Sequence, residues 1–195
     1  RAGCRLGIHY NASRAAAEEV GREIRALGRA CPVIQADVAR KPEVERLFAE
    51  VEAAFGPKLD ILVNNAGALV SRELIAVMKE ETFDRVVAVN FKSVFLCSQA
   101  VGRHMIQQKC GKIISMSSIG GSVALTRLIA YCAAKGGLEQ ITKVLAVEWA
   151  PHNIQVNAVA PGWVETELTR GLRENPRLAE GLLQGEFKPG DIVAI

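Results

Sequence analysis

The sequence predicts an α/β protein built on a doubly wound parallel sheet. Short apolar runs alternate with longer stretches of helical periodicity, a pattern typical of parallel strands with helices on both faces. The run Ile61-Leu62-Val63 has no polar alternation, as expected of a strand that is covered on both faces. The 195 residues, 49 % hydrophobic and 23 % charged, fit a single domain over residues 1–195.

The elements follow from periodicity and from breaker residues. Strands are expected at 5–10, 31–36, 59–63, 112–117 and 154–160, and helices at 13–27, from Pro42 onward, at 82–108 and at 131–149. Ser13 is expected to cap the first helix and Gly28 to end it. The pattern weakens at 163–189, where we expect a substrate lid, and residues 189–193 read as the start of another helix.

Composition excludes several classes of function. The 24 Lys and Arg residues exceed the 21 Asp and Glu residues by a net charge of +3, and no block of like charges occurs. This argues against nucleic acid or a membrane as a partner, and no apolar run is long enough to span a bilayer. The five cysteines are isolated, which predicts no metal site and a reducing, cytoplasmic compartment.

Candidate site residues follow the expected strands, because ligands of open parallel sheets bind beyond the carboxyl ends of the strands. Small or polar residues occur at each of these places, namely at Asp37-Val38, Asn64-Asn65-Ala66-Gly67, Ser118 and Pro161-Gly162. Small residues at these positions would let a ligand approach the backbone closely.

Tyr131 and Lys135 lie four residues apart, on one face of a predicted helix. A nearby ammonium favours the phenolate, and lowering a tyrosine pKa from about 10 to 7 takes about 4 kcal/mol. Such a tyrosine can act as a general acid or base. Gly136 and Gly137 follow directly, and we expect them to permit close approach of a ligand or a second subunit.

Each residue taken alone also has a purely structural interpretation. Ser118 fits a turn, Asn90 a helix cap or kink, and the Tyr131–Lys135 pair a solvated helix surface. Asp37 and Thr166 fit caps of the segments that follow them.

Together, these motifs resemble the short-chain dehydrogenase/reductase family. The matching elements are Asn64-Asn65-Ala66-Gly67, Val89-Asn90-Phe91, Ser118, Tyr131-x-x-x-Lys135 and Pro161-Gly162-x-x-x-Thr166. Ketoacyl-thioester reductases and small sugar and polyol dehydrogenases are the most similar members. The resemblance implies a Rossmann-like fold, a homo-oligomer, and NAD(P)-dependent hydride transfer between nicotinamide and a ketone, 3-oxoacyl group or secondary alcohol.

The resemblance also implies roles for single residues. Tyr131 would be the general acid and base, and Lys135 would lower its pKa and hold the nicotinamide ribose. Ser118 would hydrogen-bond the substrate oxygen, and Asn90 would position a water linking Lys135 to solvent. Asp37 and Val38 would contact the adenine. The remaining cofactor contacts would be Asn64, Ala66 and Gly67 on the adenosine side and Pro161, Gly162, Val164 and Thr166 toward the nicotinamide.

NADP is the cofactor that the sequence favours, with NAD as the alternative. NAD enzymes of this type place a carboxylate after the strand expected here at 5–10, and Asn11, Ser13 and Arg14 stand there instead. Ser13 and Arg14 would suit a 2′-phosphate. The alternative is that Ser13 only caps its helix and that Arg14 is solvated.

One family element is missing from the sequence. The family opens with a strand and a glycine turn that holds the pyrophosphate, and neither this turn nor the last strand is recognisable. The first strand would lie between those at 5–10 and 59–63, so two interior edges are expected to be unpaired. Because unpaired buried backbone is costly, we expect this chain to be less stable than a complete member and to bind cofactor poorly.

Three functions therefore stay open: a ketone or 3-oxoacyl reductase, a sugar or polyol dehydrogenase of the glucose or gluconate type, and an inactive member that associates with partners. Substrate choice is expected to depend on residues 68–77, 120–129 and 163–189. Arg127 would either attract an anionic group or be solvated. The other side chains expected there form a mostly apolar wall of Leu125, Leu128, Trp163, Leu168 and Leu172.

Overall fold

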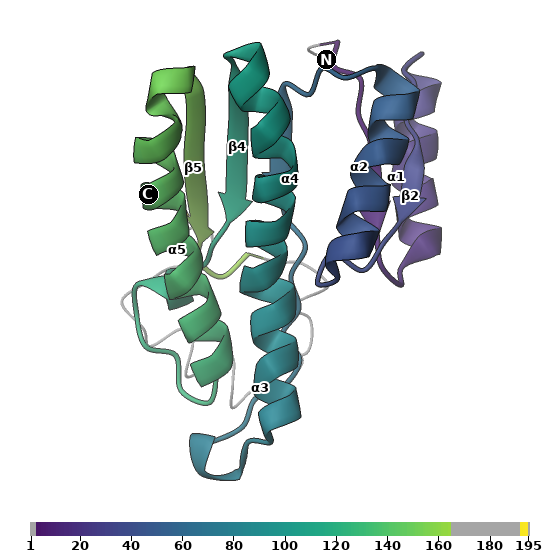
Figure 1. Ribbon diagram of the computed structural model, residues 1–195. Coiled ribbons are helices and arrows are strands. Elements are labelled where there is room, and N and C mark those ends of the chain that lie inside the picture. The colour runs from purple at the N-terminus through teal and green to yellow at the C-terminus, as the bar shows by residue number, and fades with distance from the viewer. Residues whose placement is uncertain (1–2, 165–191, 195) are drawn as a thin grey trace.

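The computed structural model describes residues 3–164 and 192–194 and has the predicted α/β architecture (Figure 1). Its main elements are β1 (Ile8–Tyr10), α1 (Arg14–Ala26), β2 (Val33–Gln35), α2 (Lys41–Phe55), β3 (Ile61–Asn64), α3 (Glu80–Val87), α4 (Ser93–Gln108), β4 (Gly111–Met116), α5 (Ile129–Trp149), β5 (Ile154–Pro161) and β6 (Ile192–Ala194). Short helical turns are η1 (Ile75–Val77), η2 (Ala88–Lys92), η3 (Ile119–Gly121) and η4 (Ala150–His152). Every strand and helix predicted before residue 163 is therefore present, with ends that differ by a few residues.

The strands form two separate sheets. β1 pairs in parallel with β2 through Ile8 and Val33, whereas β3, β4 and β5 form a parallel sheet in which Val63 lies opposite Ile114. Within the described part of the chain, no pairing joins β1 to β3. The break lies where the family's first strand is expected, so the prediction of two unpaired interior edges is confirmed.

The interpretation of residues 189–193 as the start of a helix is wrong for its last two residues. Ile192 and Val193 belong to β6, which pairs antiparallel with β5 so that Val193 lies opposite Ala160. β-branched residues favour the strand conformation, and β6 occupies an edge of β5 that would otherwise present unpaired backbone groups.

The two faces of the larger sheet differ in burial. Ile113, Val156 and Ala158 point to the face packed under α4 and α5 and are at most 6 % exposed. On β3, however, Ile61 and Val63 are 47 % and 53 % exposed. The expectation that this apolar run is covered on both faces is therefore wrong, because no described helix packs over the second face of β3.

An apolar seam joins the small sheet to the large one. It consists of buried side chains from β2, α2 and α4, and Figure 1 shows α2 beside α4 at this boundary. Its buried members are Ile34, Ala36, Val38, Val44, Leu47, Leu96 and Cys97. Among the residues that the structure describes, no hydrogen bond or ion pair links residues 3–57 to residues 58–163. Side-chain packing therefore holds the two parts together.

Helix ends follow the predicted breakers more closely than the predicted cap. Gly28 ends α1 with a φ of +74° and Gly56 ends α2 with a φ of +83°, values that favour glycine. Ser13 does occupy the N-cap position of α1, but its side chain makes no capping hydrogen bond. Its carbonyl accepts the Ala17 N–H instead, so the predicted side-chain cap is wrong.

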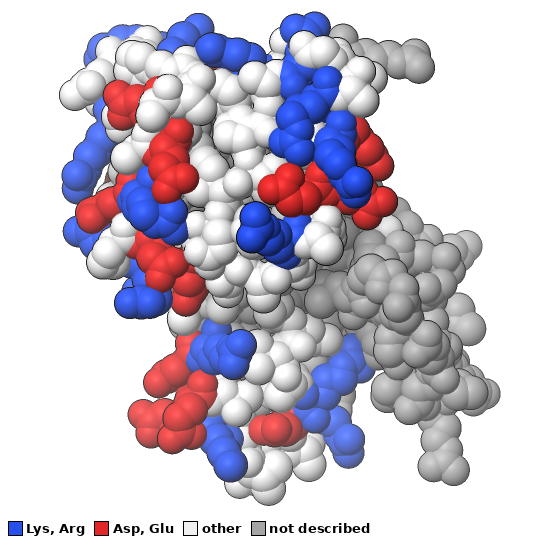
Figure 2. Space-filling model, turned by 90° about the vertical axis from the view of Figure 1, so that its right-hand side faces the viewer, with Lys and Arg blue, Asp and Glu red and all other residues white. Residues whose placement is uncertain are grey.

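Charges of both signs are mixed on the surface formed by α1 and α2 (Figure 2). Ion pairs along these helices include Arg25–Glu18 at 3.2 Å and Arg40–Glu43 at 3.0 Å. Such exposed pairs contribute little stability, and this surface shows no extended patch of one sign. None of the described helices is long and apolar enough to cross a membrane.

Candidate active site

A cavity of about 400 Å³ lies at the carboxyl ends of β3, β4 and β5. All four side chains predicted to be catalytic line it, and so do several predicted cofactor contacts: Asn90, Ser118, Tyr131, Lys135, Gly67, Pro161, Gly162 and Val164. Leu125, Leu128 and Trp163 form part of its apolar wall, as predicted. The fold therefore brings these residues together from segments that are up to about a hundred positions apart in the sequence.

Lys135 is buried in this cavity and is 4 % exposed. Its ammonium donates a hydrogen bond of 2.6 Å to the carbonyl of Met116 at the end of β4. Burial lowers the pKa of Lys135 from 10.5 to about 8, since desolvation disfavours the charged form. The interpretation of Tyr131 and Lys135 as a solvated helical pair is therefore wrong.

Tyr131 is half-buried, and the Lys135 ammonium lies 5.6 Å from the centre of its ring, which is within the range of a cation–π contact. Burial raises the pKa of Tyr131, while a hydrogen bond with Ser118 acts in the opposite direction. The expectation that Lys135 lowers this pKa is therefore wrong for the structure as it stands. The cause is that the ammonium lies over the ring and is bonded to Met116, while burial desolvates the phenol.

Ser118 forms the entry to η3, directly after β4. Its hydroxyl oxygen accepts the Gly120 N–H at 3.1 Å. The turn interpretation of Ser118 is therefore correct, and it is compatible with a chemical role because the same hydroxyl also meets Tyr131. The turn fixes the position of the oxygen and leaves its proton available for donation.

Asn90 sits in η2, a π-helical turn that interrupts the helix predicted over 82–108. Its amide nitrogen donates to the carbonyls of Ala68 at 2.8 Å and Val86 at 2.9 Å, and its oxygen accepts the Ala68 N–H at 3.2 Å. Asn90 is fully buried. Single π-turns inside helices are frequent at functional sites. This one fixes the chain next to Gly67, where an added Cβ would lie 3.0 Å from the Asn90 oxygen.

Glu139 is a buried carboxylate that the sequence analysis missed. It accepts hydrogen bonds from the hydroxyls of Ser117 at 2.8 Å and Ser122 at 3.2 Å, and these two serines flank η3. Glu139 lies one helical turn beyond Lys135, so the spacing from Tyr131 through Lys135 to Glu139 is the signal that could have indicated it. The carboxylate holds the turn that carries Ser118.

The glycines after Lys135 serve packing within the chain. A Cβ at Gly136 would lie 3.3 Å from the Gly121 carbonyl, and one at Gly137 would lie 3.2 Å from the Phe91 ring. These contacts explain the two glycines within one chain, and approach of a ligand or a second subunit stays a prediction. The close neighbours are η3 and the π-turn of the same chain.

Three predicted cofactor contacts have side chains that are used inside the protein. The Asn64 amide donates to Ser98 at 3.2 Å and to Ser115 at 3.3 Å. Val38 belongs to the apolar seam and Ala66 packs against it. Asn65, by contrast, lines the cavity although no cofactor contact was predicted for it. Because successive strand residues point to opposite faces, Asn64 faces the core and Asn65 does not.

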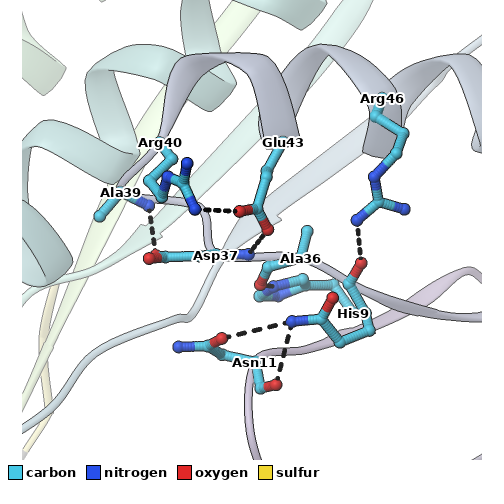
Figure 3. Close-up of polar contacts among 9 residues, drawn as sticks. His9, Asn11, Ala36, Asp37, Ala39, Arg40, Glu43 and Arg46 are labelled. Carbon is cyan, nitrogen blue, oxygen red and sulfur yellow. Dashed lines mark hydrogen bonds and ion pairs between the residues drawn. The ribbon is translucent and has the colours of Figure 1, made fainter.

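Asp37 and Asn11 lie at the carboxyl ends of β2 and β1 (Figure 3). One Asp37 oxygen accepts the Ala39 N–H at 3.0 Å, and the Glu43 carboxylate accepts the Asp37 N–H at 2.7 Å. Asp37 therefore stabilises the turn before α2 and does not cap that helix, whose N-cap residue is Arg40. The amide of Gln35 donates to the carbonyl of Asn11 at 3.2 Å, so the loop after β1 is tied to β2.

Ser13 and Arg14 are exposed at the start of α1, and neither lines the cavity. Arg127 is also exposed, in agreement with its solvated interpretation. Thr166, Leu168 and Leu172 lie outside the described residues, as does nearly all of the predicted lid at 163–189.

Comparison with known proteins identifies the family. Residues 1–177 match the family model described as short chain dehydrogenase. The chain belongs to the short-chain dehydrogenase family. The recognition made from the motifs is therefore confirmed.

Similar proteins of this family carry names that refer to different compounds. The chain is 42 % identical over 135 residues to an NAD-dependent glycerol dehydrogenase of Listeria innocua, covering 69 % of this chain and 52 % of that protein. It is 39 % identical over 173 residues to the 3-oxoacyl-(acyl-carrier-protein) reductase FabG of Staphylococcus epidermidis, covering 89 % of this chain and 70 % of that one. It therefore spans about half of the first relative and rather more of the second.

A solved structure with the same fold is a gluconate 5-dehydrogenase from Burkholderia cenocepacia in complex with NADP and tartrate. The two chains superpose with a TM-score of 0.85 at 34 % identity, over 96 % of this chain and 74 % of the other. The Rossmann-like fold predicted from the sequence is therefore confirmed.

Proposed function

We propose that this protein is an NAD(P)-dependent oxidoreductase that interconverts a ketone or 3-oxoacyl group and a secondary alcohol. The observation that carries the proposal is the convergence of Ser118, Tyr131 and Lys135 on one cavity in a short-chain dehydrogenase. The nicotinamide supplies the hydride when it is bound. The protein supplies the proton and the binding groups.

The described residues fit a nicotinamide riboside in part of the cavity. Lys135 donates one hydrogen bond to Met116, and an ammonium has two further donors for ribose hydroxyls. Gly67, Pro161 and Gly162 line the same space and carry little side-chain bulk that would block a flat ring.

Tyr131 is the proton donor in this proposal. Its raised pKa keeps the phenol protonated at neutral pH, which is the form that can protonate a carbonyl oxygen during reduction. The O–H bond breaks as the new O–H bond of the alcohol forms, and the reverse transfer accompanies oxidation. A raised pKa therefore favours carbonyl reduction near neutral pH and alcohol oxidation at higher pH.

Ser118 orients the substrate oxygen. Its oxygen accepts the Gly120 N–H, a bond that does not use the hydroxyl proton, so this proton can be donated to a developing alkoxide. Asn90 fixes the Gly67–Ala68 backbone beside Lys135. A water held between Asn90 and Lys135 stays a prediction.

The test is turnover of the chain with millimolar NADPH and acetoacetyl thioester, compared with Tyr131→Phe and Ser118→Ala. We expect Tyr131→Phe to lose about 100-fold or more in kcat, in line with the loss of a general acid, with an unchanged melting temperature. The wild-type rate of carbonyl reduction should fall only at strongly alkaline pH, because burial raises the pKa of Tyr131 above its ordinary value. Equal rates for wild type and Tyr131→Phe, or no turnover by the wild type, would contradict the proposal.

The preferred cofactor in this proposal is NADP. Asn11, Ser13 and Arg14 are exposed beside the carboxyl end of β1, and none of them carries the negative charge that would repel a 2′-phosphate. Arg14→Ala should weaken NADPH binding and leave NADH binding unchanged, whereas Arg22→Ala on the exposed side of α1 should affect neither. Equal effects of Arg14→Ala on both cofactors would contradict the assignment.

A second candidate is a sugar or polyol dehydrogenase. The similarity to a glycerol dehydrogenase and a gluconate 5-dehydrogenase favours it. Oxidation of glycerol or gluconate at a higher kcat/KM than reduction of the acyl thioester would select this candidate.

We also propose that α4 and α5 form a subunit contact. Leu138 is fully buried and Leu145 and Trp149 pack in the core, but Phe95, Val144 and Val147 are 43 %, 51 % and 77 % exposed. Exposed apolar side chains on adjacent helices are typical of an interface. Val147→Glu should lower the mass measured by light scattering if this proposal holds, and an unchanged mass would contradict it.

A further inference from the structure

We propose that Arg72 forms an anion subsite in the active-site cavity and that the substrate is an alcohol or ketone carrying a carboxylate or a similarly compact anionic group. The inference rests on the proposed function, whose substrate class it narrows.

Arg72 has a buried donor without a partner. Its Nη2 atom is shielded from solvent, and no group among the described residues accepts a hydrogen bond from it. The hydroxyl of the neighbouring Ser71 is buried and unpartnered as well. Buried polar groups are nearly always hydrogen-bonded, so two adjacent exceptions beside a cavity indicate a place where a ligand supplies the acceptor.

The charges around the cavity favour an anion. Arg72 and Lys135 are the charged side chains among the described residues that line it, and no Asp or Glu is present among these. Lys135 is bonded to the Met116 carbonyl, whereas no carboxylate in the described part of the chain forms an ion pair with Arg72. Burial lowers the pKa of Arg72, but a guanidinium stays protonated in proteins. A cation in this setting is costly until an anion pairs with it.

The form of the cavity narrows the class of anion. Apolar side chains surround the guanidinium's cavity, including Leu69, Leu125, Leu128 and Trp163. They lower the polarity of the surroundings, which strengthens a charged hydrogen bond. A carboxylate matches the planar fork of a guanidinium with two parallel hydrogen bonds. Ser118 and Tyr131 line the same cavity, so one small molecule can place its carboxylate on Arg72 and its reacting oxygen on this pair.

Two sources could supply the anion: a substrate carboxylate or a cofactor phosphate. Arg72 follows the segment Asn65–Gly67 closely in the sequence, and the wall of the cavity is mostly apolar, which favours a compact organic acid. Binding of a cofactor phosphate by Arg72 is the alternative outcome of the test.

The experiment measures equilibrium binding of two probes by Trp163 fluorescence, with no need for turnover. The probes are 3-hydroxybutyrate and 1,3-butanediol, which share a four-carbon skeleton and a secondary alcohol and differ in the carboxylate. We expect the wild type to bind the acid more tightly than the diol. Arg72→Met should weaken acid binding by about 10- to 100-fold, as for loss of a charged hydrogen bond, and leave the diol unchanged.

Controls separate the subsite from a general effect. Arg72→Lys keeps the charge but not the fork, so acid binding should be intermediate. Arg103→Met removes an exposed cation from α4 and should change nothing. Melting temperatures report whether each variant folds. If Arg72→Met does not fold, the comparison of wild type with Arg72→Lys still decides the test.

Three results would overturn the inference: no preference of the wild type for the acid, equal acid binding by wild type and both Arg72 variants, or a loss of NADPH binding without a loss of acid binding. Acid binding that depends on Arg72 in a chain that shows no turnover would contradict the proposed function and leave the subsite standing. Turnover without Arg72-dependent acid binding would contradict the subsite and leave the proposed function standing.

Discussion

Replacing Lys135 by Met should stabilise the fold at neutral pH. Burial lowers the pKa of Lys135 from 10.5 to about 8. At about 1.4 kcal/mol per unit of pKa, the charged ammonium therefore costs the folded state about 3 kcal/mol. The hydrogen bond to Met116 offsets about 1 kcal/mol. We expect Lys135→Met to unfold at a higher urea concentration than the wild type at pH 7. Its free energy of unfolding should be higher by about 2 kcal/mol.

The pH dependence gives the sharper test. Because the folded pKa lies below the unfolded value, the unfolded chain binds the extra proton between about pH 8 and 10.5. This group's contribution to wild-type stability therefore rises with pH across that window, and the advantage of Lys135→Met shrinks. Lys143→Met, an exposed change on the same helix, should show neither effect. A difference between wild type and Lys135→Met that stays constant from pH 7 to 10.5 would refute the reasoning.

Three further outcomes are expected. Gly121→Ala should cost about 1–3 kcal/mol in urea unfolding, because its Cβ would lie 2.8 Å from the Glu139 carboxyl carbon; an unchanged midpoint would contradict this packing. Met105→Ala should cost about 2–5 kcal/mol, since this side chain is fully buried, and a loss below 1 kcal/mol would argue against a close-packed site. Burial raises the pKa of Cys97 to about 12, so iodoacetamide should label the exposed Cys4 first and reach Cys97 only upon unfolding, as mass spectrometry of timed samples can check.

Much of the fold follows from periodicity. The alternation of apolar runs and amphipathic stretches predicted every β-strand before residue 163 and the main helices, although a π-turn divides the helix expected at 82–108, and Gly28 ends its helix as expected. The convergence of Ser118 and Tyr131 on one cavity was also predictable, because the carboxyl ends of parallel strands meet at one edge.

Other features depend on tertiary contacts that periodicity does not report. The apolar residues Ile61 and Val63 indicate a strand suited to burial, but exposure depends on whether another element covers them. The π-turn at Asn90 is stabilised by hydrogen bonds to Ala68, 22 positions away. Glu139 acquires its role only when α5 packs against η3.

Whether the pKa of Tyr131 is raised or lowered also depends on three-dimensional detail. Helical spacing places Lys135 near the ring, but it does not determine whether the ammonium faces the hydroxyl or the Met116 carbonyl. The desolvation that dominates this pKa arises from the whole cavity wall. Sequence spacing can therefore identify the pair but not the balance of forces on it.

The seam between α2 and α4 gives the molecule two energetically distinct parts. Residues 3–57 can detach from the rest without breaking a backbone hydrogen bond of the larger sheet, at the cost of exposing one apolar cluster. Amide exchange should then be faster, and cooperativity lower, in β1, α1 and β2 than in β4 and β5. The Asn11 and Asp37 loops belong to the first unit and Tyr131 to the second, so a ligand that contacts both would act as a cross-link that couples their unfolding.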